Sequence, residues 1–438
     1  MPAKTAITRA ARRIAARLVL AVVTGLSVFE GPAYSQNGMG EMPGCPHGGE
    51  LRLGSQDHLL GDWCGLRTRL LERGVRFDFQ YVSDSLWGFK SQQTSQFEPW
   101  NRFRATVDID FGKLAGQDGL YFHATGLAQG GGNLGQDLGL VTGPSSLVSA
   151  NTTRLDSWWI EKRWLDDRIA IRVGQFAGQD FYGNAQYGES FINGPMGYAL
   201  GNLSTTFETA NPFATPAAEI RIVPIDYLYL KSMVMAGDPL PLTSNPTGLV
   251  PTFRGSPVVV SEIGFTPGRS ATSVDDVESR KGYSGLYQFG VAYNPGDLTT
   301  PLSPIPVSGN YLLYWKASQA LWRIDPKEAR GLDVTFAIDW SPPNVNRNFM
   351  QLTAGLRFNE PLPLDFHNSI SLGYVRNSLS SAFLPPGMAS WKTEHGVEFN
   401  ILLAYGPFLV QPVIQYYANV GGIGGRAFVA GLRTRIDF

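Results

Sequence analysis

Apolar and polar side chains alternate with a period of two along most of the chain from residue 75 onward. In residues 101–111, NRFRATVDIDF, Phe103 and Val107 fall on one face, whereas Arg104 and Asp108 fall on the other. Successive side chains of a β-strand point to opposite faces, so this segment predicts a strand with one apolar and one charged face. An amphipathic helix is excluded, because these charges would surround it.

The same alternation recurs often enough to predict about 16 antiparallel strands, most of them near the length of about ten residues that a tilted strand needs to cross a bilayer. The expected strands cover residues 75–87, 101–111, 119–128, 154–164, 168–176, 217–224, 226–236, 257–265, 284–294, 309–319, 331–340, 348–358, 367–376, 395–405, 408–418 and 426–438.

The segments between these strands are rich in Gly, Pro, Asn and Asp and differ in length. Residues 165–167 and 406–407 are short turns, which in outer-membrane barrels lie on the periplasmic side, with long loops outside. We therefore expect an all-β transmembrane outer-membrane β-barrel over residues 75–438. Its long connections should lie together at the outer end, namely residues 129–153, 177–216, 237–256, 266–283 and 377–394.

Aromatic residues such as Trp87, Trp164 and Tyr405 stand at strand ends, where rings would meet the membrane interface. A soluble β-sandwich or propeller would also alternate. However, the apolar faces of about 16 strands would leave a sandwich few apolar residues to cover its ends and corners. No repeat of about 40 residues supports a propeller. The membrane barrel is therefore the favoured fold.

The first 35 residues have the three parts of a secretory signal peptide. Lys4 and four arginines precede the apolar run Leu18–Phe29, and Ala33-Tyr34-Ser35 offers small residues for cleavage. A single anchoring helix is the alternative, for which the run is short. We expect export, cleavage near Ser35, and location in the outer membrane of a Gram-negative cell.

Residues 36–74 are expected to form an N-terminal periplasmic segment. Leu66, Leu70 and Leu71 are at helical spacing, and Gly74 can end a helix. This pattern predicts a short helix over Leu66–Arg73, at the periplasmic end of the barrel.

Composition narrows the function of the 438-residue chain. Only 17% of the residues are charged, 50 are glycines, and the formal net charge is −1. A near-neutral chain is not a strongly basic nucleic-acid-binding protein, so no nucleic-acid partner is expected.

The two cysteines, Cys45 and Cys64, both precede the first expected strand. In an oxidising periplasm they could form a disulfide. Two free or buried thiols, or a zinc site with His47 and His58, are the alternatives, although these spacings match no tight zinc pattern. We expect no metal and no cofactor.

A closed barrel of about 16 strands is wide enough to enclose an aqueous channel, so the charged strand faces should line water. Charges of both signs suit neutral polyhydroxylated solutes, although they could also simply pair across strands. Trp158 and Trp159 must face opposite ways on one strand, and an inward ring would offer a sugar a flat apolar surface. The candidate pore-lining and sugar-binding residues are Arg102, Arg104, Asp108, Asp110, Trp159, Glu161, Arg172, Glu219 and Arg221.

An outer-membrane enzyme is the competing class of protein. The chain has five histidines, and none lies in a Gly-x-Ser-x-Gly elbow or an H-E-x-x-H zinc motif. We therefore predict that the protein is not an enzyme.

Two longer motifs are specific enough to indicate a family. Residues 59–81 read LLGDWCGLRTRLLERGVRFDFQY, and residues 157–194 begin SWWIEKRWLDD and end FING. Both resemble the carbohydrate-selective porins of the OprB type, and the resemblance extends over about residues 58–438. It implies a 16-stranded outer-membrane barrel that passes monosaccharides and similar solutes by diffusion. Cys64 stands where that family commonly has Gly, which suggests a local disulfide with Cys45.

The expected function is a porin giving passive, carbohydrate-preferring diffusion, with small sugars and outer-membrane lipid as its partners. The motifs do not identify the solute, so a porin for other small hydrophilic nutrients and a non-selective porin stay open. The sequence does not distinguish a monomer from a homo-oligomer such as a trimer.

Overall fold

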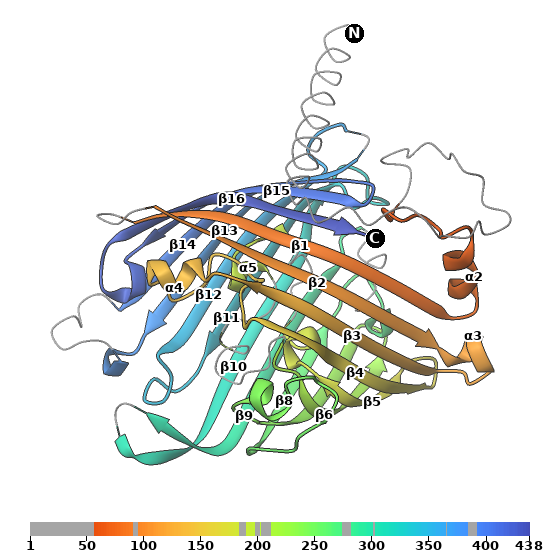
Figure 1. The fold of residues 1–438 in the computed structure, drawn as a ribbon, viewed down its shortest axis with the longest axis horizontal. Helices are drawn as coiled ribbons and strands as arrows, with labels where there is room; N and C mark the ends of the chain where they lie inside the picture. Colours follow the sequence, from red (N-terminus) through yellow and green to blue (C-terminus); the bar gives the residue numbers. More distant parts are fainter. Residues whose placement is uncertain are drawn as a thin grey trace, which may run out of the picture.

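The chain forms a closed barrel of 16 antiparallel strands, each paired with its neighbours in sequence, and β1 with β16 (Figure 1). The computed structural model describes residues 57–90, 95–183, 190–197, 202, 212–273, 282–300, 303–364, 366–383 and 392–438. The signal peptide expected over residues 1–35, and Cys45, lie outside these residues.

The strands have the following bounds: β1 Val75–Lys90, β2 Gln96–Asp110, β3 Leu120–Gly131, β4 Thr152–Trp164, β5 Ile169–Phe176, β6 Thr215–Ile225, β7 Leu228–Ala236, β8 Pro257–Phe265, β9 Gly285–Thr300, β10 Ser303–Arg323, β11 Gly331–Trp340, β12 Asn348–Asn359, β13 His367–Leu379, β14 Thr393–Tyr405, β15 Phe408–Ala418 and β16 Arg426–Asp437.

The strand count expected from the alternation is confirmed, and most boundaries agree within a few residues. The largest difference is the β9–β10 hairpin, whose pairing continues well past the expected ends at residues 294 and 309. Alternation ends where one face no longer meets lipid, whereas backbone pairing can continue into water. The sequence pattern therefore underestimates strands that extend beyond the membrane.

Burial along the strands is the reverse of that in a soluble protein. On β5, the inward Arg172 is 7% exposed, whereas its neighbour Val173 is 55% exposed. On β14, Glu398 is 0% exposed and Phe399 is 39% exposed. The outward faces are apolar because they meet lipid, and the inward faces are polar because they meet water and other polar groups.

The helices are short: α2 Leu66–Glu72, α3 Phe111–Ala115, α4 Leu134–Leu138, α5 Gly194–Gly197 and α7 Pro241–Ser244, with single 3₁₀ turns at η2 Gly178–Asp180, η4 Ala271–Ser273, η6 Ser381–Phe383 and η7 Val420–Gly422. None of the helices in the described ranges is long and apolar enough to cross a membrane. Figure 1 shows α2 and α3 at the end of the barrel that holds the C-terminus, and α4 at the opposite end.

The connection after β8 begins at the end with the short turns, where its residues 266–273 lie, so the expected place of residues 266–283 among the outer loops is wrong. The Thr266 amide donates to the Tyr227 carbonyl, and the Ala271 amide to the Asp226 carbonyl, both in the β6–β7 turn. In an up-and-down barrel the end is decided by whether an odd or an even strand precedes the connection, and this one follows β8. The length of the connection does not indicate at which end of the barrel it lies.

Two apolar clusters mark where the connections enter the barrel. One joins Phe176 and Tyr182 to Met233 and Leu312, and the other joins Leu134 of α4 and Ile192 to wall residues that include Leu86 and Tyr417. The interior is therefore partly filled by segments that fold inward from the rim.

The segment before β1 lies on the outer flank of the barrel. The Trp63 ring lies 6.3 and 6.2 Å from the outward rings of Phe77 and Phe79. The Arg67 guanidinium donates to the carbonyl oxygens of Phe77 (3.0 Å) and Phe438 (2.9 Å). The predicted short helix is thus present, and it packs beside the wall at the β1–β16 seam.

The turn before α2 has a left-handed backbone, a conformation that favours glycine, and Cys64 lies in this turn. Trp63, Cys64 and Gly65 have φ of 48, 59 and 80°, in the left-handed region that costs a residue with a Cβ about 1–2 kcal/mol. Cys64 is disulfide-bonded. Because Cys45 lies outside the described residues, its pairing with Cys64 stays a prediction.

Replacing Arg67 with Ala should weaken closure of the seam, because the Phe77 and Phe438 carbonyls lose a charged donor, a loss of about 1–3 kcal/mol. We expect the folded band in SDS electrophoresis to convert to the unfolded band at a lower temperature. Arg69→Ala is the matched control, since Arg69 bonds the Gly65 carbonyl of its own segment. Equal shifts in both variants would contradict the role of Arg67.

Candidate functional site in the barrel lumen

The connection between β5 and β6 enters the lumen and is held against the β7–β10 wall. The Gly183 amide donates to Glu262 Oε2 (2.8 Å), and Lys316 Nζ donates to the Gly183 carbonyl (2.7 Å). Lys231 Nζ donates to the Phe181 carbonyl. These contacts place the rings of Phe181 and Tyr182 inside the barrel.

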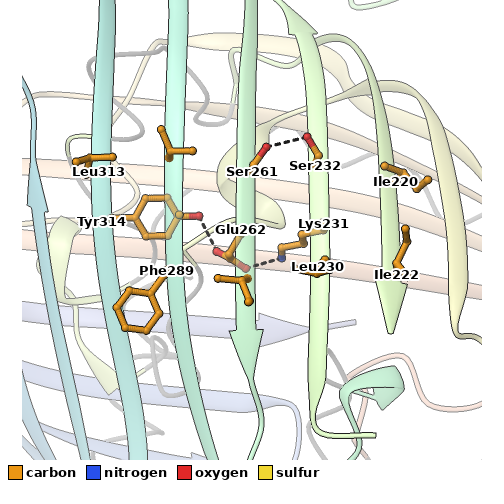
Figure 2. Close-up of a pocket in the computed structure, with 13 residues that line it drawn as sticks. Ile220, Ile222, Leu230, Lys231, Ser232, Ser261, Glu262, Phe289, Leu313 and Tyr314 are labelled. Atoms are coloured by element: carbon orange, nitrogen blue, oxygen red, sulfur yellow. Dashed lines mark hydrogen bonds and ion pairs between the residues drawn. The ribbon is translucent and has the colours of Figure 1, made fainter. Parts of the chain in front are cut away.

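Glu262 is the centre of this attachment (Figure 2). It accepts hydrogen bonds from the hydroxyls of Tyr229 and Tyr314, both at 2.7 Å, and pairs with Lys231 at 3.1 Å. The two tyrosines reach it because their rings lie over glycines: a Cβ at Gly264 or Gly290 would stand 2.1 Å from the ring. The buried carboxylate is therefore fully partnered, as a buried charge must be.

Tyr182 of the connection packs against this wall and stays neutral. Burial, together with the nearby carboxylates of Glu219 and Glu262, raises the pKa of Tyr182 well above its usual value. Its ring lies 4.7 Å from Lys231 Nζ.

The outward side of the same strands carries a separate apolar groove. Figure 2 shows Ile220, Phe289 and Leu313 around it, and Ser232 and Ser261 joined by a 2.8 Å hydrogen bond. These side chains belong to the lipid-facing set, so the groove is not part of a path through the lumen.

A chain of alternating charges crosses the inward faces of β4, β5 and β6. Glu161 pairs with Arg163 and Arg172, both at 2.5 Å, and Arg172 also pairs with Glu219 at 3.0 Å. The three strands bring these residues together because Glu161 is in register with Arg172, and Arg172 with Glu219. Arg221 lies two residues beyond Glu219 and donates to the Thr272 carbonyl at 3.3 Å.

Aromatic rings surround the central guanidinium of this chain. Arg172 Cζ lies 3.8 Å from the Phe181 ring centroid and 4.6 Å from that of Trp159. The His123 ring stacks on Trp159 with centroids 4.9 Å apart and an interplanar angle of 11°. Trp159 shares the inward face with Glu161, whereas Ile160 between them is exposed on the outside.

The charged face of β2 also points inward, and it connects to this cluster through His123. Asp108 accepts from Arg76 at 2.7 Å and contacts His123 Nδ1 at 2.6 Å. Arg102 and Arg104 lie on the same face of β2, and the alternate residue Phe103 is 40% exposed to the outside.

Asp110 lies in the same register row as the chain of alternating charges, because it is opposite Tyr121 on β3, and Tyr121 is opposite Glu161 on β4. It ends β2 and caps α3, accepting hydrogen bonds from the amides of Gly112 (2.9 Å) and Lys113 (3.3 Å). Although it continues the alternation of Asp108, it stands at a helix N-terminus, where a carboxylate satisfies free amides. Its carboxylate therefore also holds α3, and its place among the pore-lining residues stays a prediction.

Sequence reasoning missed the side chains contributed by the β5–β6 connection and its supporting wall. Lys231 and Glu262 follow the same period-two alternation as the candidate pore-lining residues, so this alternation was the signal that could have identified them. Phe181 and Tyr182 carry no periodic signal, because they belong to an irregular segment. Within the described residues, no group of three or more His, Cys, Asp and Glu side chains could hold a metal ion.

Comparison with known proteins identifies the family. Residues 95–438 match the model of the carbohydrate-selective porin, OprB family. The chain belongs to this family. As an OprB-family member, it is 28% identical over 156 residues to Porin B of Pseudomonas aeruginosa, which is 30% of this chain and 34% of that protein. It is 21% identical over 434 residues to the putative porin QuiX of Acinetobacter baylyi, covering 88% of this chain and 94% of that one.

The fold of this OprB-family chain is similar to a solved porin. The high-pH structure of Pseudomonas putida OprB matches with a TM-score of 0.77 at 18% identity, over 88% of this chain and 99% of that one. Its low-pH structure matches with a TM-score of 0.57. At these identities the likeness establishes the barrel fold.

Replacing Glu161 with Gln should make the lumen more anion-selective, because Arg163 and Arg172 would lose a shared counter-charge. The reversal potential of the purified channel in a salt gradient measures this change. Asp166→Asn removes one negative charge from an exposed turn and should leave the reversal potential unchanged. The same reversal potential in Glu161→Gln and wild type would show that the Glu161 network does not face the permeating ions.

Proposed function

We propose that this chain forms a passive outer-membrane channel that prefers small carbohydrates. The observation that carries the proposal is the inward cluster of Trp159, Phe181, Glu161, Arg172 and Glu219 beside a connection that enters the lumen. Aromatic rings offer apolar faces to the C–H groups of a sugar, and charged groups on either side can hydrogen-bond its hydroxyls.

The alternation of charge within the cluster favours neutral solutes. Each carboxylate lies beside a guanidinium, so the wall has donors and acceptors at short intervals and no large field of one sign. Arg102, Arg104, Asp108 and Asp110 extend this mixed lining on β2, and Asp110 also caps α3.

The proposal includes a location and an assembly. A signal peptide over residues 1–35, cut near Ser35, would deliver the chain to the outer membrane, with residues 36–74 on the periplasmic side and residues 75–438 as the barrel. Small sugars and membrane lipid are its partners, as a monomer or a homo-oligomer such as a trimer. Diffusion through the lumen requires no catalysis and no cofactor.

A channel for other small hydrophilic nutrients is the second candidate. Arg102 and Arg104 on the inward face of β2 favour it, because guanidinium groups also bind carboxylates. Transport measurements with neutral sugars and with sugar acids of the same size distinguish the two candidates.

Replacing Trp159 with Ala should weaken block of the ion current by a disaccharide about three- to tenfold, since one ring contact contributes about 1 kcal/mol. The block constant of single channels in a planar bilayer measures this. Trp158→Ala is the control, because it removes the neighbouring ring from the opposite face of β4.

Two results would count against the proposed function. A wild-type channel whose current does not fall on adding sugar would remove carbohydrate preference. Equal weakening in the Trp158 and Trp159 variants would show that the inward ring has no particular role in sugar contact.

A further inference from the structure

We infer that Glu398 on β14 is a positioning residue that holds residues 190–193 of the β5–β6 connection inside the barrel and thereby sets the bore of the channel. The inference rests on the proposed function, since it concerns the geometry of the same path. Glu398 contacts none of the residues proposed to meet the solute, so its effect would be transmitted through the connection.

The Glu398 carboxylate binds two successive backbone amides of the connection. Ile192 N donates to Oε1 at 2.8 Å, and Asn193 N donates to Oε2 at 2.7 Å. The side-chain amides of Asn400 and Gln415 complete the set at 2.7 and 2.8 Å. All four donors are neutral, and Glu398 is fully buried. Each of the two carboxyl oxygens thus accepts from two N–H donors, and these four hydrogen bonds make the attachment a firm one.

Phe191 supports the same attachment by packing against two glycines of the wall. A Cβ at Gly355 would stand 2.7 Å from the Phe191 ring, and a Cβ at Gly373 would stand 2.7 Å from that ring and 2.5 Å from Met196 Sδ. These inward positions on β12 and β13 therefore need glycine, because the ring and the Met196 side chain occupy the space of a side chain.

Neighbouring contacts extend the attachment to a second inward connection. Asn193 Nδ2 donates to the Tyr417 hydroxyl at 2.9 Å and to the Gly143 carbonyl at 3.3 Å. Glu394 lies four residues before Glu398 on the same face of β14 and accepts from the amides of Val141 (3.0 Å) and Gly421 (2.7 Å). A single strand therefore holds both connections by carboxylates that accept backbone amides.

The connection is attached to opposite parts of the wall. Residues 181–183 bind Lys231, Glu262 and Lys316 on β7, β8 and β10, whereas residues 190–193 bind Glu398 and its neighbours on β14 and β15. Figure 1 shows α5, which follows at Gly194–Gly197, within the outline of the barrel. Releasing the β14 attachment would free one side of the connection while Phe181 stays in place beside Arg172.

Glu398→Gln tests the attachment with almost no change in size. Whichever way the new amide is oriented, its NH₂ group faces one of the two backbone amides and cannot accept from it. We expect hydrogen exchange over residues 190–196 to accelerate about tenfold or more, because a buried backbone amide is left without its acceptor. We also expect single-channel conductance in KCl to rise, with more frequent current fluctuations, and larger sugars to enter proteoliposomes.

Gly373→Ala tests the same attachment from the wall side, without changing any charge. Its Cβ should displace Phe191 and Met196 and produce the same changes in exchange and conductance. Gly126→Ala is the matched control on β3, where a new Cβ would meet its nearest neighbour at 3.8 Å. Glu360→Gln is the control for charge, because Glu360 lies in the exposed β12–β13 turn and should leave both measurements unchanged.

The outcomes separate this inference from the proposed function. Faster exchange and higher KCl conductance in both test variants support the positioning role even if no sugar blocks the wild-type channel. The inference would be overturned if the variants exchanged hydrogen over residues 190–196 at the wild-type rate. It would also be overturned if their exchange were faster but their conductance unchanged. If Glu398→Gln does not fold, judged by its mobility in SDS electrophoresis before heating, Gly373→Ala alone decides by the same two measurements.

Discussion

Closure of the hydrogen-bonded sheet is the constraint on which the rest of this structure depends. In the hydrocarbon part of a membrane no water satisfies a free strand edge, so β1 must pair with β16. That pairing runs from Gln80 with Asp437 to Lys90 with Ala427. The segment before β1 adds to the same seam, because Arg67 bonds the carbonyls of Phe77 and Phe438, on its two sides.

Closure creates an interior lined by polar side chains, and this interior explains how the connections are held. Glu262, Glu394 and Glu398 all point inward, and each would be costly to bury without partners. Each accepts backbone amides from an inward segment, so the wall supplies acceptors to irregular backbone that has no sheet of its own. Buried charge and inward connection thus stabilise each other.

Much of the fold could be predicted from the sequence, because the alternation of Arg104, Asp108 and their neighbours is a local property of each strand. The Glu161–Arg172 register also follows from the short β4–β5 turn, whereas Arg172 meets Glu219 across the long β5–β6 connection, which fixes no register locally. Asp110 shows the limit of this reasoning, since the alternation does not reveal that its carboxylate also caps α3. The connection after β8 shows another, because its length did not reveal at which end of the barrel it begins.

The sequence by itself determined the strands, their two faces and the family, because a period of two and short motifs are readable within about ten residues. Only the tertiary structure decided which residues meet in the lumen. Phe181 reaches Arg172, and Asn193 reaches Glu398 from 205 residues away in the chain. Such contacts depend on the path of an irregular connection through a closed barrel, and no periodic pattern encodes that path.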